Sequence, residues 1–193
     1  MTELKREDSG PAGDETRHCA TSDLERRHAA LGTAPADSGR VTLIVRRRAD
    51  GIRETPERAR LSAEEGVPGD GWSRRPPRDP EAQLAVMRSD IAALIANGQA
   101  LTLFGDNLFV DLDLSDRNLP TGSRLRVGQA LVEVTPKPHN GCLKFKSRFG
   151  QDALRFVQER ETRWQNRRGI YWKVIEPGDV HVGAAIEVLL RPR

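Results

Sequence analysis

The chain has 193 residues, a mean hydropathy of −0.59 and a formal net charge of +3 from 31 basic and 28 acidic residues. That length suits one ordinary domain with a tail, and no apolar run approaches the roughly 20 residues that a membrane-spanning helix requires. The near balance of charge argues against a nucleic-acid-binding protein, and the charged N-terminus argues against a secretory peptide, so we expect a cytoplasmic protein.

Residues 1–39 are predicted to form a mobile tail and a short helix, outside a main domain of residues 40–193. Gly10–Gly13 interrupts any periodicity in a polar stretch that extends to about residue 20. Ser22 and Glu25 have the spacing of a capping box, which predicts the start of the helix.

The first half of the main domain alternates strand signals with a long irregular segment. The β-branched run Val41–Val45 predicts the first strand. Residues 64–80 contain four prolines and three glycines, which predicts a long loop, and Trp72 argues that this loop docks onto the domain. A strand over Leu84–Met87 and a helix over Ser89–Ala96 are predicted to follow, with Asn97-Gly98 ending the helix.

The second half is predicted to be mostly strand. Residues Leu108–Leu114 alternate in polarity, which favours a strand with one face inward. The remaining predicted elements are a hairpin of Arg124–Val127 with Ala130–Val134, a helix over Gln151–Glu159, and strands over Gly169–Ile175 and Ala185–Leu190. Short strands between turn signals predict a mainly β fold with a few helices, closed into a small barrel or sheet.

The densest chemistry surrounds Cys142. A thiolate is both a nucleophile and a metal ligand, and cationic neighbours stabilise it; Lys144, Lys146 and Arg148 follow closely, with His139 three residues before. The alternative, of equal weight from the pattern alone, is a small buried hydrophobic cysteine. The other cysteine, Cys19, is distant and no paired CxxC spacing exists, which argues against a structural zinc site.

Two other features have two interpretations each, and a third has one. Asp106 and Asn107 could orient a ligand, or could form the turn that begins a strand. Asp70 could face a cleft or cap its loop. The basic run Arg46–Arg48 is interpreted as solvated surface charge. The sequence contains no GxGxxG helix start, phosphate-loop motif or GxSxG elbow.

Several segments, in this order, resemble the MOSC domain, the C-terminal domain of molybdenum cofactor sulfurases that also occurs as small stand-alone proteins. They are GVPGDGW, GDNL, LPTGSRLRVGQALVEVT, HNGCLKF and RGIYWKVIEPGDVHVG, followed by a final strand, and they extend from about Val41 to Leu190. The resemblance implies a MOSC-type barrel-like sheet with peripheral helices.

The family cysteine, which carries sulfur or ligates the molybdenum of molybdopterin, maps onto Cys142. The resemblance therefore implies a molybdopterin-type cofactor, or sulfur carried on Cys142, with a sulfur donor or redox partner protein and no membrane. Lys144, Arg148 and Arg168 are candidates for the pterin phosphate on charge alone. Asp106, Asn107 and Asp70 are further cofactor-binding candidates, and His139 is a candidate proton donor.

If the protein is a reductase, the resemblance implies N-hydroxylated substrates. The alternative is a sulfur-carrier or binding module without catalysis or metal. Two departures matter: the chain is too short to hold a pyridoxal-phosphate domain, and Ala184 follows Gly183 where many relatives have aspartate.

Overall fold

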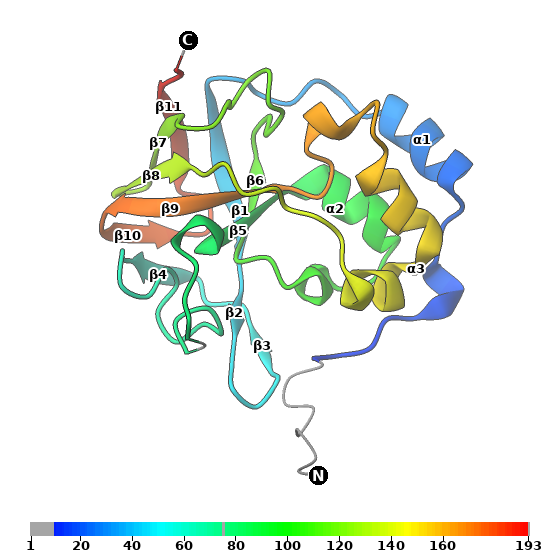
Figure 1. Cartoon of the computed structure of the whole chain (residues 1–193), viewed down its shortest axis with the longest axis horizontal. Helices are drawn as coiled ribbons and strands as arrows, with labels where there is room; N and C mark the ends of the chain where they lie inside the picture. Colours follow the sequence, from blue (N-terminus) through cyan, green and yellow to red (C-terminus); the bar gives the residue numbers. More distant parts are fainter. Residues whose placement is uncertain (1–9, 75, 193) are drawn as a thin grey trace.

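Figure 1 shows the computed structural model, which describes residues 10–74 and 76–192. Its centre is a closed barrel in which β6 returns to pair with β1 and all neighbours are antiparallel except β5 and β6. The barrel strands, in spatial order, are β1 (Ser38–Ile44), β11 (Ala185–Leu190), β7 (Arg124–Val127), β8 (Ala130–Val134), β9 (Ile170–Glu176), β5 (Leu84–Arg88) and β6 (Leu108–Asp111). The mainly β, barrel-like architecture is confirmed.

The hairpin of β7 and β8 has its predicted bounds and shows how local sequence directs the barrel. Val127 pairs with Ala130, so only two residues form the turn, and Gly128 has a φ of +55°. A Cβ atom on Gly128 would lie 2.7 Å from the backbone oxygen of Asp179. Glycine is therefore required there both for the turn and for the close approach of β10 (Gly178–His181).

Two small sheets lie outside the barrel and were not predicted. One pairs β2 (Arg46–Arg47) with β3 (Arg53–Glu54), and the other pairs β4 (Arg58–Leu61) with β10 (Gly178–His181). Strands of two to four residues are too short to show a period-2 pattern, so their formation depends on partners supplied by the fold.

The helices gather on one side of the barrel (Figure 1). They are α1 (Thr21–Ala29), α2 (Ser89–Ala96) and α3 (Leu143–Gln158), with short 3₁₀ turns η1 (Glu15–Arg17), η2 (Pro80–Ala82), η3 (Leu101–Phe104) and η4 (Arg163–Gln165). Within the described part of the chain, no helix has the length and apolar character needed to cross a bilayer.

Two hydrophobic cores result, one inside the barrel and one between the barrel and the helices. Strand β6 contributes to both, because Val110 packs inside the barrel while Phe109 packs among the helices, and both are fully buried. The predicted inward face is confirmed, because Leu108, Val110, Leu112 and Leu114 all lie in the barrel core. The other face was not expected to be buried, and the helices cover it at Phe109.

The N-terminal region differs from the prediction. The expected mobile tail at residues 1–9 lies outside the described residues, but Gly10 onward packs against the domain, and Leu24 of α1 is fully buried in the core beneath the helices. The N-cap of α1 is Ala20, with no side-chain capping bond. The predicted capping box is not formed, and the helix is instead held by packing on α2 and α3.

Helix α3 begins at Leu143, eight residues before its predicted start. Gly150 has non-helical angles (φ 93°, ψ 166°) and kinks the helix, so only the part after the kink was expected. The first part matters more for the site, because it starts directly after Cys142.

Candidate functional site

A cleft of about 440 Å³ lies where the long loop of residues 64–80, α3 and the start of β9 meet. Its wall includes Cys142 and His139, with aromatic rings from Trp72, Phe104, Phe145 and Tyr171. Its basic lining residues are Arg47, Arg53, Arg78, Lys144, Arg148 and Arg168. The cleft thus combines a thiol, planar apolar walls and a high density of positive charge.

Cys142 is exposed and is a free thiol. It occupies the N-cap position of α3, where its backbone oxygen accepts a hydrogen bond from the Lys146 amide at 2.9 Å. The preceding Gly141 packs so closely on α3 that a Cβ atom there would lie 2.4 Å from Leu154. The interpretation of Cys142 as a small buried hydrophobe is wrong.

Asp106 and Arg168 form a buried ion pair behind the cleft. Nη1 of Arg168 donates to both carboxylate oxygens of Asp106, at 3.0 and 2.7 Å, and the side chains are 7% and 0% exposed. The guanidinium also lies over the Phe145 ring, 5.2 Å from its centroid. Burial raises the pKa of Asp106, and the charges of Arg168 and Arg47 oppose that effect. Nε of Arg168 is buried with no hydrogen-bond partner among the described residues.

His139 lies beside this pair with one ring nitrogen unsatisfied. Its Nδ1 is 3.5 Å from Oδ1 of Asp106 and makes no hydrogen bond with any described residue, and its side chain is 5% exposed. Burial, followed by the charges of Arg168 and Arg47, lowers the pKa of His139 well below its usual value. His139 is therefore a neutral imidazole near pH 7, because burial and the two neighbouring arginines disfavour its protonated form. Its predicted role as a proton donor stays a prediction.

Tyr171 completes this wall of the cleft. Its ring lies against His139, with centroids 4.3 Å apart. Burial raises the pKa of Tyr171, the nearby Asp106 carboxylate adds to the effect, and the charges of Arg168 and Arg47 oppose it. The phenol therefore keeps its proton at neutral pH and can donate a hydrogen bond into the cleft.

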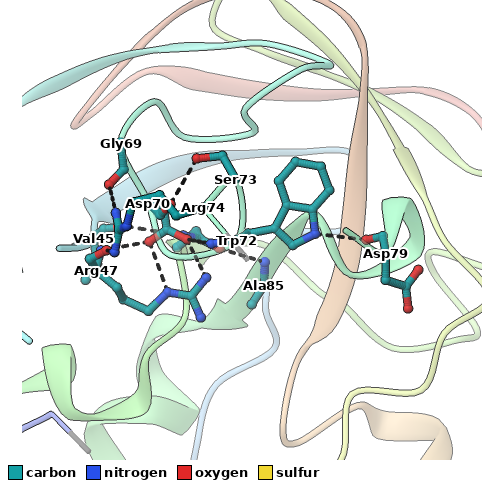
Figure 2. Close-up of polar contacts among 10 residues, drawn as sticks. Val45, Arg47, Gly69, Asp70, Trp72, Ser73, Arg74, Asp79 and Ala85 are labelled. Carbon is teal, nitrogen blue, oxygen red and sulfur yellow. Dashed lines mark hydrogen bonds and ion pairs between the residues drawn. The ribbon is translucent and has the colours of Figure 1, made fainter. Parts of the chain in front are cut away.

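Asp70 holds the long loop against β2, as Figure 2 shows. It accepts hydrogen bonds from the backbone nitrogen and Nε of Arg47, at 2.7 and 3.0 Å, and from the Trp72 amide at 3.0 Å. Burial alone would raise the pKa of Asp70, but the hydrogen bonds and charge of Arg47 outweigh it and lower the pKa to about 2. The indole of Trp72 donates to the Asp79 carbonyl at 2.9 Å. These bonds place the Trp72 ring at the edge of the cleft.

Asn107 is turned away from the cleft, although it follows Asp106 directly. Its Oδ1 accepts from the Ala85 amide at 3.1 Å and its Nδ2 donates to the Val45 carbonyl at 3.4 Å, all in buried surroundings. Asn107 therefore ties β5 to the end of β1, and it is not among the residues that line the cleft. Both polar groups of its side chain are bonded to the backbone, and its predicted role in binding a cofactor stays a prediction.

Of the predicted site residues, Cys142, His139, Lys144, Arg148 and Arg168 line the cleft together. Asp106 and Asp70 do not line the cleft, but each binds an arginine that does: Asp106 binds Arg168 and Asp70 binds Arg47. The sequence interpretation missed Arg47 and Tyr171. Arg47 was assigned to solvated surface charge, which is wrong, because its side chain is about three-quarters buried and paired with Asp70. A signal for Tyr171 was its place in RGIYWKV, within the predicted strand that follows Arg168.

The chain itself supplies few metal ligands. Among residues 10–74 and 76–192, no group of three or more histidine, cysteine or acidic residues is arranged to hold a metal ion. A metal in the cleft would meet one protein thiolate, and its other ligands would have to arrive with it.

Comparison with known proteins supports the resemblance. Solved structures with the same fold include the YuaD protein from Bacillus subtilis (18% identity, covering 78% of this chain and 95% of that one, TM-score 0.58). They also include YiiM from Escherichia coli (24% identity, covering 79% of this chain and 71% of that one, TM-score 0.51). A third is YiiM from Geobacillus stearothermophilus (15% identity, covering 79% of this chain and 76% of that one, TM-score 0.52). No curated protein gives a significant sequence match. The family model of the MOSC domain matches residues 78–187, more than half of the chain. The chain therefore belongs to the MOSC domain family.

Proposed function

We propose that this MOSC-family protein binds a molybdopterin-type cofactor in the cleft, with the sulfur of Cys142 as the protein ligand to molybdenum. The observation that carries the proposal is an exposed thiol on a cleft lined by six arginine and lysine residues. Thiolate sulfur suits a soft or sulfur-bound metal centre, and guanidinium groups suit a phosphate.

The donor set fits such a group. Because the described residues offer a single thiolate and no cluster of further ligands, they suit a metal that brings its own sulfur donors. Phe104, Phe145 and Tyr171 provide planar surfaces for a fused ring. Arg148 and Lys144 lie on the same wall, where an anionic phosphate would meet positive charge. When bound, the molybdenum would supply two-electron redox chemistry.

The residues around Cys142 would position the second reactant. Asp106 holds Arg168 in place, Nδ1 of His139 has no hydrogen-bond partner among the described residues and could bond to a ligand, and the Tyr171 hydroxyl could donate a hydrogen bond. The family resemblance extends the proposal to N-hydroxylated compounds as the substrate class. A redox partner protein would then provide the electrons.

The test is molybdenum analysis of protein made in a host that synthesises the cofactor. Wild type, Cys142→Ser and Cys19→Ser would be purified in parallel, with Cys19→Ser as the matched loss of the other thiol. We expect wild type and Cys19→Ser to carry equal molybdenum and Cys142→Ser to lose most of it. Equal metal in wild type and Cys142→Ser would overturn the ligand assignment.

The second candidate is a sulfur carrier, favoured by the exposure of Cys142 as a free thiol. The Cys142 thiolate would attack the terminal sulfur of a donor persulfide, the donor's S–S bond would break, and the donor cysteine would leave as a thiolate. Intact mass after incubation with a cysteine desulfurase and cysteine should then show one added sulfur in wild type and Cys19→Ser, but none in Cys142→Ser. Absence of that mass gain in wild type would exclude the carrier function.

A further inference from the structure

Asn140 lies in the wall of the cleft, directly after His139 and two residues before Cys142. Its Oδ1 accepts a hydrogen bond from Nη2 of Arg163 at 2.5 Å. Arg163 belongs to η4 and is not among the residues that line the cleft. The oxygen of the Asn140 amide is therefore held by a residue outside the cleft.

This bond determines which atom of the Asn140 amide remains for a ligand. A guanidinium group has N–H donors and no acceptor, so the amide atom that meets Arg163 is the oxygen. The amide nitrogen Nδ2, which carries the donors, then points away from Arg163. No described residue accepts a hydrogen bond from Nδ2, and Asn140 is exposed. Asn140 thus keeps unused donors close to Cys142 in the chain.

Tyr171 supplies a second donor, next to His139. It lines the cleft, its ring lies against His139 with centroids 4.3 Å apart, and no described residue is bonded to its hydroxyl group. The Tyr171 carbonyl accepts hydrogen bonds from the backbone nitrogen of Thr135 at 3.0 Å and from its Oγ1 at 3.3 Å. These bonds tie β9 to the start of the segment that carries Asn140 and Cys142.

Both donors are uncharged, in contrast to the arginines nearby. Arg168 is paired with Asp106, and Arg47 is paired with Asp70, so buried carboxylates balance these two charges. Asparagine and tyrosine side chains are among the donors that stabilise negative charge as it develops on an oxygen atom. A pair of neutral N–H and O–H donors therefore matches an oxygen acceptor on a ligand.

We infer that Nδ2 of Asn140 and the hydroxyl of Tyr171 bind an oxygen atom of the group that reacts at Cys142. Arg163 is a positioning residue, because it acts on the ligand only by holding the Asn140 amide in this orientation. The ligands that fit are compounds with an oxygen acceptor next to the reacting atom. The inference rests on the proposed function in that Cys142 is the reacting or ligating residue.

The experiment compares two neutral alkylating probes of similar size: 2-bromoacetamide, which has a carbonyl oxygen, and allyl bromide, which has no oxygen or nitrogen acceptor. Each forms a bond between the Cys142 sulfur and its bromine-bearing carbon, bromide leaves, and the thiol proton passes to the buffer. Mass spectrometry of the peptide that contains Cys142 gives each rate without a contribution from Cys19. The bromoacetamide-to-allyl bromide rate ratio is then divided by the same ratio for a short neutral cysteine peptide. For wild type we expect a value of about 3 or more, because one net hydrogen bond changes a rate several-fold.

Three variants test the donors, and a change in the thiolate fraction affects both probes alike and cancels in the ratio. Asn140→Ala removes the amide, and Asn140→Asp keeps its size but replaces the donor with an acceptor. Tyr171→Phe removes only the hydroxyl and keeps the ring against His139. Each variant should lower the normalised ratio by about twofold or more, because it removes one hydrogen bond to the carbonyl oxygen of bromoacetamide.

Two arginine variants test the positioning role as a matched pair. Arg163 and Arg155 are both exposed, and Arg155 pairs with Asp152 at 3.1 Å on the surface of α3. Arg163→Met should lower the normalised ratio by about twofold, because the Asn140 amide is then free to turn, whereas Arg155→Met should leave the ratio at the wild-type value. Arg163→Lys retains a donor and should give a ratio between those of Arg163→Met and wild type.

The outcomes separate the inference from the proposed function. A wild-type ratio equal to that of the peptide, or a high ratio that neither Asn140→Ala nor Tyr171→Phe lowers, would overturn the oxygen-binding site without touching the molybdenum assignment. A ratio that falls in these variants but not in Arg163→Met would overturn only the role of Arg163. If Cys142→Ser keeps its molybdenum while the ratios change as expected, the ligand assignment fails and the oxygen-binding site stands.

Discussion

Two buried carboxylates flank the cleft, Asp70 on the side of the long loop and Asp106 on the side of α3, and each is paired with an arginine. Asp70 receives hydrogen bonds from Arg47 and from two backbone amides, and its pKa falls to about 2. Asp106 is more deeply buried, and burial raises its pKa in spite of Arg168. The pKa values of these two aspartates are therefore shifted in opposite directions, although both residues are buried and paired with an arginine.

The groups around the two carboxylates differ in the same way. Near Asp70 the bonds serve to hold the loop and to place Trp72. Near Asp106, Nε of Arg168 and Nδ1 of His139 are buried without partners among the described residues. Unsatisfied buried donors and acceptors are costly. Asp70 therefore holds the long loop in place, whereas the groups beside Asp106 keep hydrogen-bonding capacity that the proposed ligand could use.

The largest expected effect comes from removing the charge of Asp70, whose bonds to Arg47 and Trp72 are here called the Asp70 clamp. Asp70→Asn leaves Arg47 without its charge partner, and we expect the free energy of unfolding to fall by about 3 kcal/mol. The control is Asp179→Asn, because Asp179 pairs with Arg60 at 3.4 Å and both side chains are exposed; its loss should stay below about 1 kcal/mol. Urea unfolding of both variants measures the difference. Equal losses would show that the clamp contributes no more than a surface pair.

A second test uses acid to separate the two carboxylates. The folded pKa of Asp70 is lower than its usual 3.8, so its contribution of about 2 kcal/mol is present above pH 3.8 and is lost as the pH falls to about 2. The folded pKa of Asp106 is raised, so its carboxylate reduces stability as the pH rises from 3.8 through the folded value. Urea unfolding between pH 2 and 6 should therefore show that the wild-type advantage over Asp70→Asn grows with pH.

For Asp106→Asn, the same series should give the opposite slope: the free energy of unfolding of the wild type should fall relative to that of the variant as the pH rises. Parallel slopes for the two variants would show that the carboxylates have the same environment, and the contrast between them would be lost.

The smallest expected effect is at His139. His139→Gln should change the free energy of unfolding by less than about 1 kcal/mol, because Nδ1 makes no hydrogen bond that the substitution could remove. Asn107→Ala is the contrasting variant and should cost about 2 kcal/mol, since it leaves the Ala85 amide and the Val45 carbonyl buried without partners. A large loss for His139→Gln would mean that His139 supports the fold and is not held ready for a ligand.

Elements with strong local signals were predicted well. The helix over Ser89–Ala96 has its predicted bounds, because Asn97 and Gly98 adopt the positive φ values that end it. The hairpin of β7 and β8 was also placed correctly. The start of α3 and the small sheet of β2 and β3 were missed, because a kink at Gly150 and two-residue strands have no periodic pattern to detect.

The candidate site was only partly predictable. Cys142 was identified from its basic neighbours and from the family resemblance, and its exposure agrees with that assignment. Arg47 and Arg148 were harder, because their positions depend on distant partners: Asp70 for the first, and Pro11 with Leu103 for the second. No local pattern shows which member of a basic run is buried.

The amino-acid sequence alone determined the class of fold, the hairpin of β7 and β8, the end of α2, the family resemblance and the cysteine at the centre of the site, since each depends on turn residues, periodicity or short motifs within a few positions. Only the tertiary structure decided that Asp106 and Arg168, 62 residues apart, form one buried pair, that Asn107 turns away from the cleft, and that the Pro11 carbonyl reaches Arg148. Barrel closure and strand register set those distances, and they are properties of the whole chain.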